Sequence, residues 1–204
     1  MMKMKVDVRH VGRELGRGAY AAVFAMKTPG IVVKVCFDDE DNYHDYIDWL
    51  IDNDVNSSAR PVMFPCKSTQ KLARFALKEW RTMFKGDDTG EFDDLDVHEN
   101  MDDGPRAYVG ERLMDGYSLF KKDPRKLERL VCLLQINSCF DPNPTAKRQL
   151  TRLCNEFKIL NQDAVLRLLR KLEREDLLTD LNGGNVMFRK VSGGWELVVT
   201  DPAC

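Results

Sequence analysis

Short apolar runs separated by turn residues dominate the start of the chain, a pattern typical of strands. A segment over 11–15 that begins and ends with an apolar residue and an apolar run over 22–25 lie on either side of a glycine-containing turn, and a β-branched run over 31–37 follows a Thr-Pro-Gly turn at 28–30. Short β-branched runs bounded by turn residues predict buried strands. We therefore expect three consecutive strands in the N-terminal part of the chain.

Helical periodicity replaces this pattern further along. Apolar residues recur at i, i+3, i+4, i+7 and i+8 over positions 43–51, and apolar faces also predict helices at about 68–84, 127–140 and 150–178. Two hairpins are expected as well. The first covers residues 95–114 and has its turn at 103–104. The second covers residues 186–200 and has its turn at 192–194. A strand-rich half followed by a helix-rich half predicts an α+β fold.

Composition places the chain among ordinary globular proteins. Its 204 residues are 43% hydrophobic and 31% charged, which suits one domain that can have two lobes. The formal net charge of −2 gives no reason to expect direct nucleic-acid binding. No apolar run approaches the ~20 residues that span a bilayer, and no signal core follows residues 1–5, so we expect a cytoplasmic protein. The six cysteines include no C-x-x-C pair, which favours reduced, mostly buried thiols over a zinc site.

A glycine loop and a strand lysine form the first candidate site. Gly16 and Gly18 lie between the first two predicted strands, where glycine lets the backbone approach a phosphate chain. The alternative to a phosphate-binding loop is a glycine-containing hairpin with no ligand. Lys34 interrupts the third apolar run, and burying an unpaired ammonium costs several kcal/mol, so either it faces water at a sheet edge or it has a partner. A lysine on the strand behind such a loop is placed to hold α- and β-phosphates.

Polar residues near the C-terminus form the second candidate site. Asp180 and Asn185 share a short glycine-containing loop, and Asp201 follows the last predicted strand. If the hairpin closes, Asp201 returns beside Asn185. Carboxylate and amide oxygens can orient a hydroxyl and bind Mg²⁺. A helix end followed by a polar turn is the structural alternative.

The order of these residues resembles the protein-kinase-like superfamily, with its glycine loop, strand lysine, D-x-x-x-x-N loop and metal-binding aspartate. The chain looks most like the early-gene serine/threonine protein kinases of podovirus-type tailed bacteriophages. This similarity covers both ends and hardly touches residues 50–175. It implies a two-lobed fold, with a strand-rich N-lobe over about 1–115 and a minimal, truncated helical C-lobe over about 116–204.

The same resemblance implies ATP and Mg²⁺ as cofactors and a role for each residue. Asp180 would accept the proton of the substrate hydroxyl and Lys34 would bind the α/β-phosphates. Asn185 and Asp201 would hold Mg²⁺. The remaining ATP contacts would come from the glycine loop, the adenine pocket and the hinge: Leu15, Gly16, Gly18, Val23, Glu111 and Leu113.

Several positions depart from the kinase pattern. Ala21 stands for the third loop glycine, Leu-Thr precedes Asp180 where kinases have His-Arg, and Pro-Ala follows Asp201 in place of Phe-Gly. Either Asp48 or Glu79 could be the acidic partner of Lys34, and the sequence does not decide between them. Only three residues follow Asp201 in this sequence, so we expect no switch by phosphorylation of an activation loop.

The implied function is a protein kinase that transfers the γ-phosphate of ATP to serine or threonine hydroxyls of host proteins early in phage infection. The partners would be these protein substrates, with no membrane and no nucleic acid. Two alternatives remain: a small-molecule phosphotransferase of the aminoglycoside- or choline-kinase type, and a pseudokinase that acts as a binding or inhibitory module. Oligomeric state and a tyrosine acceptor stay open.

Overall fold

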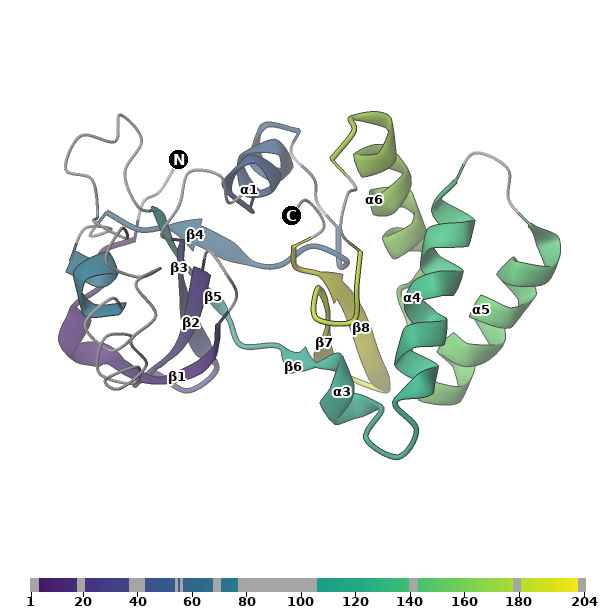
Figure 1. Ribbon diagram of the computed structural model, residues 1–204, viewed down its shortest axis with the longest axis horizontal. Helices are drawn as coiled ribbons and strands as arrows, with labels where there is room; N and C mark the ends of the chain where they lie inside the picture. Colours follow the sequence, from purple (N-terminus) through teal and green to yellow (C-terminus); the bar gives the residue numbers. More distant parts are fainter. Residues whose placement is uncertain are drawn as a thin grey trace, which may run out of the picture. The chain divides into compact units, whose positions relative to one another are not determined.

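The computed structural model describes residues 4–17, 21–36, 43–53, 55, 57–67, 71–76, 106–139, 143–177 and 181–201. The chain divides into two compact units, each described by itself below. Unit 1 comprises Met1–His44 and Val62–Arg112, and unit 2 comprises Asp45–Pro61 and Leu113–Cys204. The architecture is mixed α+β, with a five-stranded sheet in unit 1, and helices with a three-stranded sheet in unit 2 (Figure 1).

Unit 1 is built on an antiparallel sheet with the strand order β1-β2-β3-β5-β4. The three strands predicted near the N-terminus are confirmed. A 3-10 turn, η1, precedes the sheet. The elements are η1 (Val8–His10), β1 (Val11–Arg17), β2 (Ala21–Met26), β3 (Ile31–Cys36), β4 (Met63–Pro65) and β5 (Arg106–Glu111).

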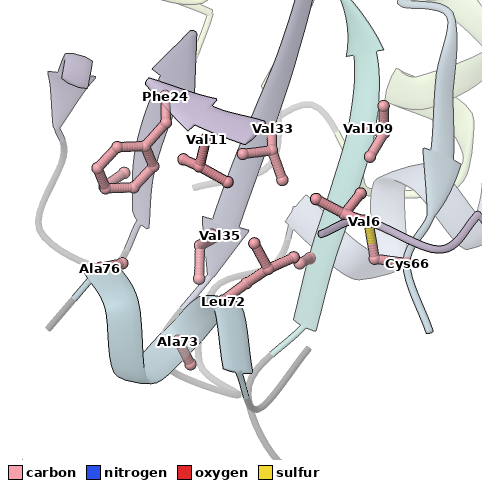
Figure 2. Close-up of a cluster of buried hydrophobic side chains, with 12 residues drawn as sticks. Val6, Val11, Phe24, Val33, Val35, Cys66, Leu72, Ala73, Ala76 and Val109 are labelled. Atoms are coloured by element: carbon pink, nitrogen blue, oxygen red, sulfur yellow. The ribbon is translucent and has the colours of Figure 1, made fainter. Parts of the chain in front are cut away.

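One face of this sheet forms the hydrophobic core of unit 1 (Figure 2). Side chains alternate along a strand, so Val33 and Val35 project to the same face of β3, and both are almost fully buried. Phe24 of β2 joins them, and residues 71–76 are helical and cover this face with Leu72. Burying a side chain such as Phe24 contributes about 1.5–3 kcal/mol.

Two sequence predictions overlap this region. Of the helix expected over 68–84, residues 71–76 are helical and the remainder lies outside the described residues. Of the hairpin expected over 95–114, residues 106–111 form β5, which pairs with β3 and β4, while 95–105 lie outside the described residues.

Unit 2 combines helices with a small sheet of order β6-β7-β8. The boundary between the units falls after the second residue of helix α1, between His44 and Asp45. The C-terminal hairpin predicted over 186–200 is confirmed as β7 and β8. The elements are α1 (Tyr43–Asp52), β6 (Met114–Asp115), α3 (Gly116–Leu119), α4 (Arg125–Ser138), α5 (Pro144–Phe157), α6 (Gln162–Arg174), β7 (Val186–Val191) and β8 (Gly194–Val199).

The helical prediction over 150–178 is confirmed in part: this stretch contains the last turns of α5 and the whole of α6, and the helix is interrupted between Phe157 and Gln162. Lys158 ends α5 in the left-handed conformation, with φ 54°. The next residues pair with β8: Leu160 N–H donates to Trp195 O at 2.9 Å, and Trp195 N–H donates to Lys158 O at 2.9 Å. Gly194 permits this approach, since a Cβ there would lie 2.2 Å from Lys158 O. The apolar spacing continues across the break, so the pattern does not reveal it.

The core of unit 2 consists of leucines from α4, α5 and α6, with two phenylalanines beside them. The largest buried side chains described in unit 2 are Tyr46, Leu50, Phe120, Leu127, Leu130, Leu134, Leu150, Leu169, Leu172 and Phe188. Within the described residues, no helix has the length and apolar content needed to cross a membrane.

The five described cysteines are free thiols, in agreement with the sequence prediction. Cys36, Cys66 and Cys154 are buried. Burial raises the pKa of Cys66 to about 11 and that of Cys154 to about 12. These two thiols therefore stay protonated at neutral pH and behave as small apolar side chains.

Candidate functional site

Lys34 lies in the middle of β3, in the interior of the five-stranded sheet. It is directly opposite Val23 of β2 and Tyr108 of β5. Because side chains alternate, Lys34 projects from the face opposite to the core residues Val33 and Val35. The structure thus rules out an edge-strand lysine and brings Lys34 and Val23, two of the predicted nucleotide contacts, side by side.

An aromatic ring contacts the Lys34 ammonium. Nζ lies 3.3 Å from the centroid of the Tyr43 ring, a cation–π contact worth about 0.5–2 kcal/mol. Tyr43 in turn packs edge-on against Tyr108, with centroids 5.3 Å apart. Sequence reasoning missed Tyr43 because it considered only acidic partners. Of these, Asp48 lies on α1 as Tyr43 does, and Glu79 lies outside the described residues.

The predicted phosphate loop begins with a bulge in β1. Glu14 is opposite Phe24 and Gly16 is opposite Val23, so Leu15 is the extra residue on β1. A bulge bends the strand and changes the direction of the following residues. Gly16 is exposed, with nothing within 4 Å of the position a Cβ would take. The structure therefore brings Gly16 beside Val23, whereas Gly18 lies outside the described residues.

The predicted hinge is held by Val62, the residue before β4. Glu111 N–H donates to Val62 O at 3.2 Å, and Glu111 Oε1 accepts from Val62 N–H at 3.0 Å. Glu111 is also opposite Ile31, three positions along β3 from Lys34. Leu113, the other predicted hinge contact, is half-buried and belongs to unit 2, next to β6.

In unit 2 the hairpin closes as predicted, and it brings Asn185 next to Asp201. Thr200 N–H and Thr200 Oγ1 both donate to Asn185 O, at 2.9 and 3.1 Å. Asp201 follows directly and is half-buried, as is Asn185. An amide and a carboxylate are hard oxygen ligands of the kind Mg²⁺ prefers, so this pair fits the implied ion.

These two residues supply only part of a coordination shell. The described residues contain no group of three or more His, Cys, Asp or Glu side chains placed to hold a metal. Mg²⁺ in nucleotide sites is bound through one or two protein ligands, with phosphate oxygens and waters completing the octahedron. The chemistry of Asn185 and Asp201 matches that kind of site.

The loop before Asn185 is organised by its own side chains. Asn182 Oδ1 accepts from the backbone N–H of Gly184 at 2.7 Å and of Asn185 at 3.2 Å, an Asx turn. Leu181 is buried, and its carbonyl accepts from Gln135 Nε2 at 2.9 Å. Asp180 itself lies outside the described residues. The Asn-Gly-Gly sequence was the available signal for the role of Asn182, which sequence reasoning missed.

A buried tyrosine contacts the strand that leads to Asp201. Tyr46 of α1 is fully buried, and its hydroxyl donates to Val199 O at 2.8 Å. Burial raises the pKa of Tyr46 well above its usual range. The negative charge of Asp201 raises it further, and the positive charge of Arg60 opposes this. Tyr46 therefore remains a neutral hydrogen-bond donor.

Comparison of the sequence with protein-family models and with curated proteins found no match. The function of this protein is therefore inferred from its own residues and their geometry. In the structure, the described site residues that the sequence predicted lie together in two groups. One is Gly16, Val23 and Lys34 in unit 1; the other is Asn185 and Asp201 in unit 2.

Proposed function

We propose that this protein is an ATP- and Mg²⁺-dependent phosphotransferase of the protein-kinase-like fold. The observation that carries the proposal is the junction of Asn185 with Asp201 at the open end of the β7–β8 hairpin. The backbones of these two residues lie next to each other there, and Asp180 comes five residues before Asn185 in the sequence. The same residue types hold Mg²⁺ in protein kinases.

The arrangement of unit 1 supports the same proposal. Lys34 lies on the third strand of an antiparallel sheet, and a helix, α1, follows that strand in the chain. Kinases place their phosphate-binding lysine on the third strand, ahead of helix C. Gly16 of β1 and Lys34 of β3 are both opposite Val23, so only β2 separates them.

Each residue would then do one simple task. Lys34 binds phosphate oxygens, Asn185 and Asp201 hold the ion, and Asp180 accepts the hydroxyl proton of the substrate. Bound Mg²⁺ would neutralise charge that develops on the phosphates. Catalysis of phosphoryl transfer consists mostly of such positioning and electrostatic stabilisation, so few reactive side chains are required.

For the acceptor we propose serine and threonine hydroxyls of host proteins in the host cytoplasm. The support is the resemblance of the Lys34 and Asp201 segments to the early-gene kinases of tailed bacteriophages. A small-molecule phosphotransferase and a pseudokinase predict different products in the same assay, so one experiment separates the three.

The test is label transfer from γ-labelled ATP and Mg²⁺ to proteins of a bacterial lysate. We expect Asp201→Ala to lower the rate by about a hundredfold or more, because transition-state charge loses its stabilisation. Asp163→Ala is the matched control, since this exposed aspartate lies in the first turn of α6. The control should retain activity, and phosphoamino-acid analysis should show phosphoserine or phosphothreonine.

Three outcomes would contradict the proposal. Equal labelling by the wild type and Asp201→Ala would remove the role of Asp201. Transfer to small alcohols but never to protein would favour the small-molecule enzyme. Binding of Mg²⁺ and nucleotide without any transfer would favour the pseudokinase.

A further inference from the structure

We propose that Tyr46 is a positioning residue for Asp201, acting through its hydrogen bond to the carbonyl of Val199. The inference rests on the proposed function, in which Asp201 binds Mg²⁺. It adds a residue from α1 that neither the glycine-loop pattern nor the Asp180–Asp201 pattern contains.

Val199 is held on both sides of β8. On the β7 side it is opposite Val186, and the next residue, Thr200, donates its N–H to Asn185 O. Hydrogen bonds alternate along an antiparallel pair, so the polar backbone groups of Val199 point away from β7. There Val199 N–H donates to Ala59 O at 2.8 Å, and Val199 O accepts the Tyr46 hydroxyl at 2.8 Å.

These two outer contacts occupy the edge of the small sheet. In the order β6-β7-β8, β8 is the last strand, and its outer hydrogen-bonding groups must find partners elsewhere. Val199 is fully buried, so water does not replace a lost partner easily. Only Thr200 separates Val199 from Asp201. A shift of the Val199 peptide would therefore move the Asp201 backbone with it.

The donor itself is fixed and neutral. Tyr46 is followed on α1 by Ile47 and Leu50, which are also almost fully buried, so the helix face that carries Tyr46 is packed. Burial and the charge of Asp201 both disfavour loss of the Tyr46 proton. The hydroxyl thus donates to Val199 at neutral pH throughout.

A second set of contacts on β8 provides the matched control. Asn161 binds both polar backbone groups of Leu197: Leu197 N–H donates to Asn161 Oδ1 at 2.8 Å, and Asn161 Nδ2 donates to Leu197 O at 2.9 Å. Leu197 lies two residues before Val199 on the same edge. Asn161→Ala therefore removes more hydrogen bonds from β8 than Tyr46→Phe does, but further from Asp201.

The experiment compares the full-length wild type, Tyr46→Phe and Asn161→Ala in three measurements. These are calorimetric titration of Mg²⁺ with a non-hydrolysable ATP analogue, hydrogen exchange of the Thr200 amide without ligand, and denaturant unfolding. We expect Tyr46→Phe to weaken Mg²⁺ binding about tenfold and to speed Thr200 exchange about tenfold. Asn161→Ala should lose at least as much stability and keep Mg²⁺ affinity within about twofold.

The outcomes separate this inference from the proposed function. Unchanged Mg²⁺ affinity and Thr200 exchange in Tyr46→Phe would overturn the positioning role, as would equal loss of Mg²⁺ affinity in Asn161→Ala. A wild type that binds no Mg²⁺-nucleotide would instead overturn the proposed function, while Thr200 exchange would still show whether Tyr46 holds the strand. If Tyr46→Phe does not fold, 4-aminophenylalanine at position 46 keeps a donor there. It should bind Mg²⁺ as the wild type does, and a tenfold loss would overturn the inference.

Discussion

The two groups of candidate site residues are held by different kinds of contact. Lys34 lies on a strand that is paired on both sides and rests on a hydrophobic core. Asn185 and Asp201 lie at the end of a hairpin whose last strand is an edge, where the outer contacts come from Tyr46 and Ala59. Lys34 is therefore placed by a whole sheet, whereas Asn185 and Asp201 are placed by a few hydrogen bonds.

This difference determines how each group should respond to substitution. A central strand is stabilised by many weak interactions, so its position changes only when packing fails. The end of an edge strand depends on individual polar contacts, so losing one can alter function before it alters stability. Three substitutions test the comparison, in order of decreasing effect.

The largest effect on stability is expected from Gly110→Ala in β5. A Cβ at this position would lie 1.9 Å from Met63 Sδ and 2.5 Å from Val62 O, and the latter is backbone. Overpacking of this kind costs about 1–3 kcal/mol of unfolding free energy. Denaturant unfolding measures it. Gly16→Ala is the control, because nothing lies within 4 Å of its Cβ position, and we expect a change within about 0.5 kcal/mol. Equal stability of the two variants would contradict the prediction.

A smaller effect on stability, with a clear effect on function, is expected from Asn182→Ala. The substitution removes the acceptor that holds Gly184 and Asn185, so the unfolding free energy should fall by about 1 kcal/mol. Mg²⁺ binding in the presence of an ATP analogue should weaken several-fold, because the backbone N–H of Asn185 is no longer held by the Asx turn. Asn182→Asp keeps an acceptor oxygen and should bind Mg²⁺ normally. Weak binding by both variants would show that the turn is not the cause.

The smallest effect on function is expected from Tyr43→Leu in α1. It removes the buried ring that lies over Lys34 Nζ, and the loss of about 0.5–1 kcal/mol of cation–π interaction should raise the KM for ATP about two- to fivefold. Tyr43→Phe keeps a ring and should retain the KM within about twofold. Steady-state kinetics with varied ATP would reveal the difference. Identical KM values in the leucine and phenylalanine variants would exclude a role for the ring.

Local patterns allowed much of the fold to be predicted. The two segments beside the glycine-containing turn and the β-branched run that follows became β1, β2 and β3, because short strands joined by tight turns depend on residues close in sequence. The same reasoning placed Asn185 beside Asp201, since a hairpin with a turn at 192–194 leaves few choices of register. The break between α5 and α6 was not predictable, because Lys158 and Leu160 bond to Trp195, more than 30 residues later.

By itself, the sequence determined that Lys34 interrupts an apolar strand and that Asn185 and Asp201 lie next to each other at the end of the C-terminal hairpin. Both follow from neighbours in sequence. Only the tertiary structure decided that Tyr43 lies against Lys34 and that Tyr46 donates to Val199, 153 residues away. The physical reason is that such contacts depend on where α1 packs, and the apolar period of a helix specifies which face is buried but not what it is buried against.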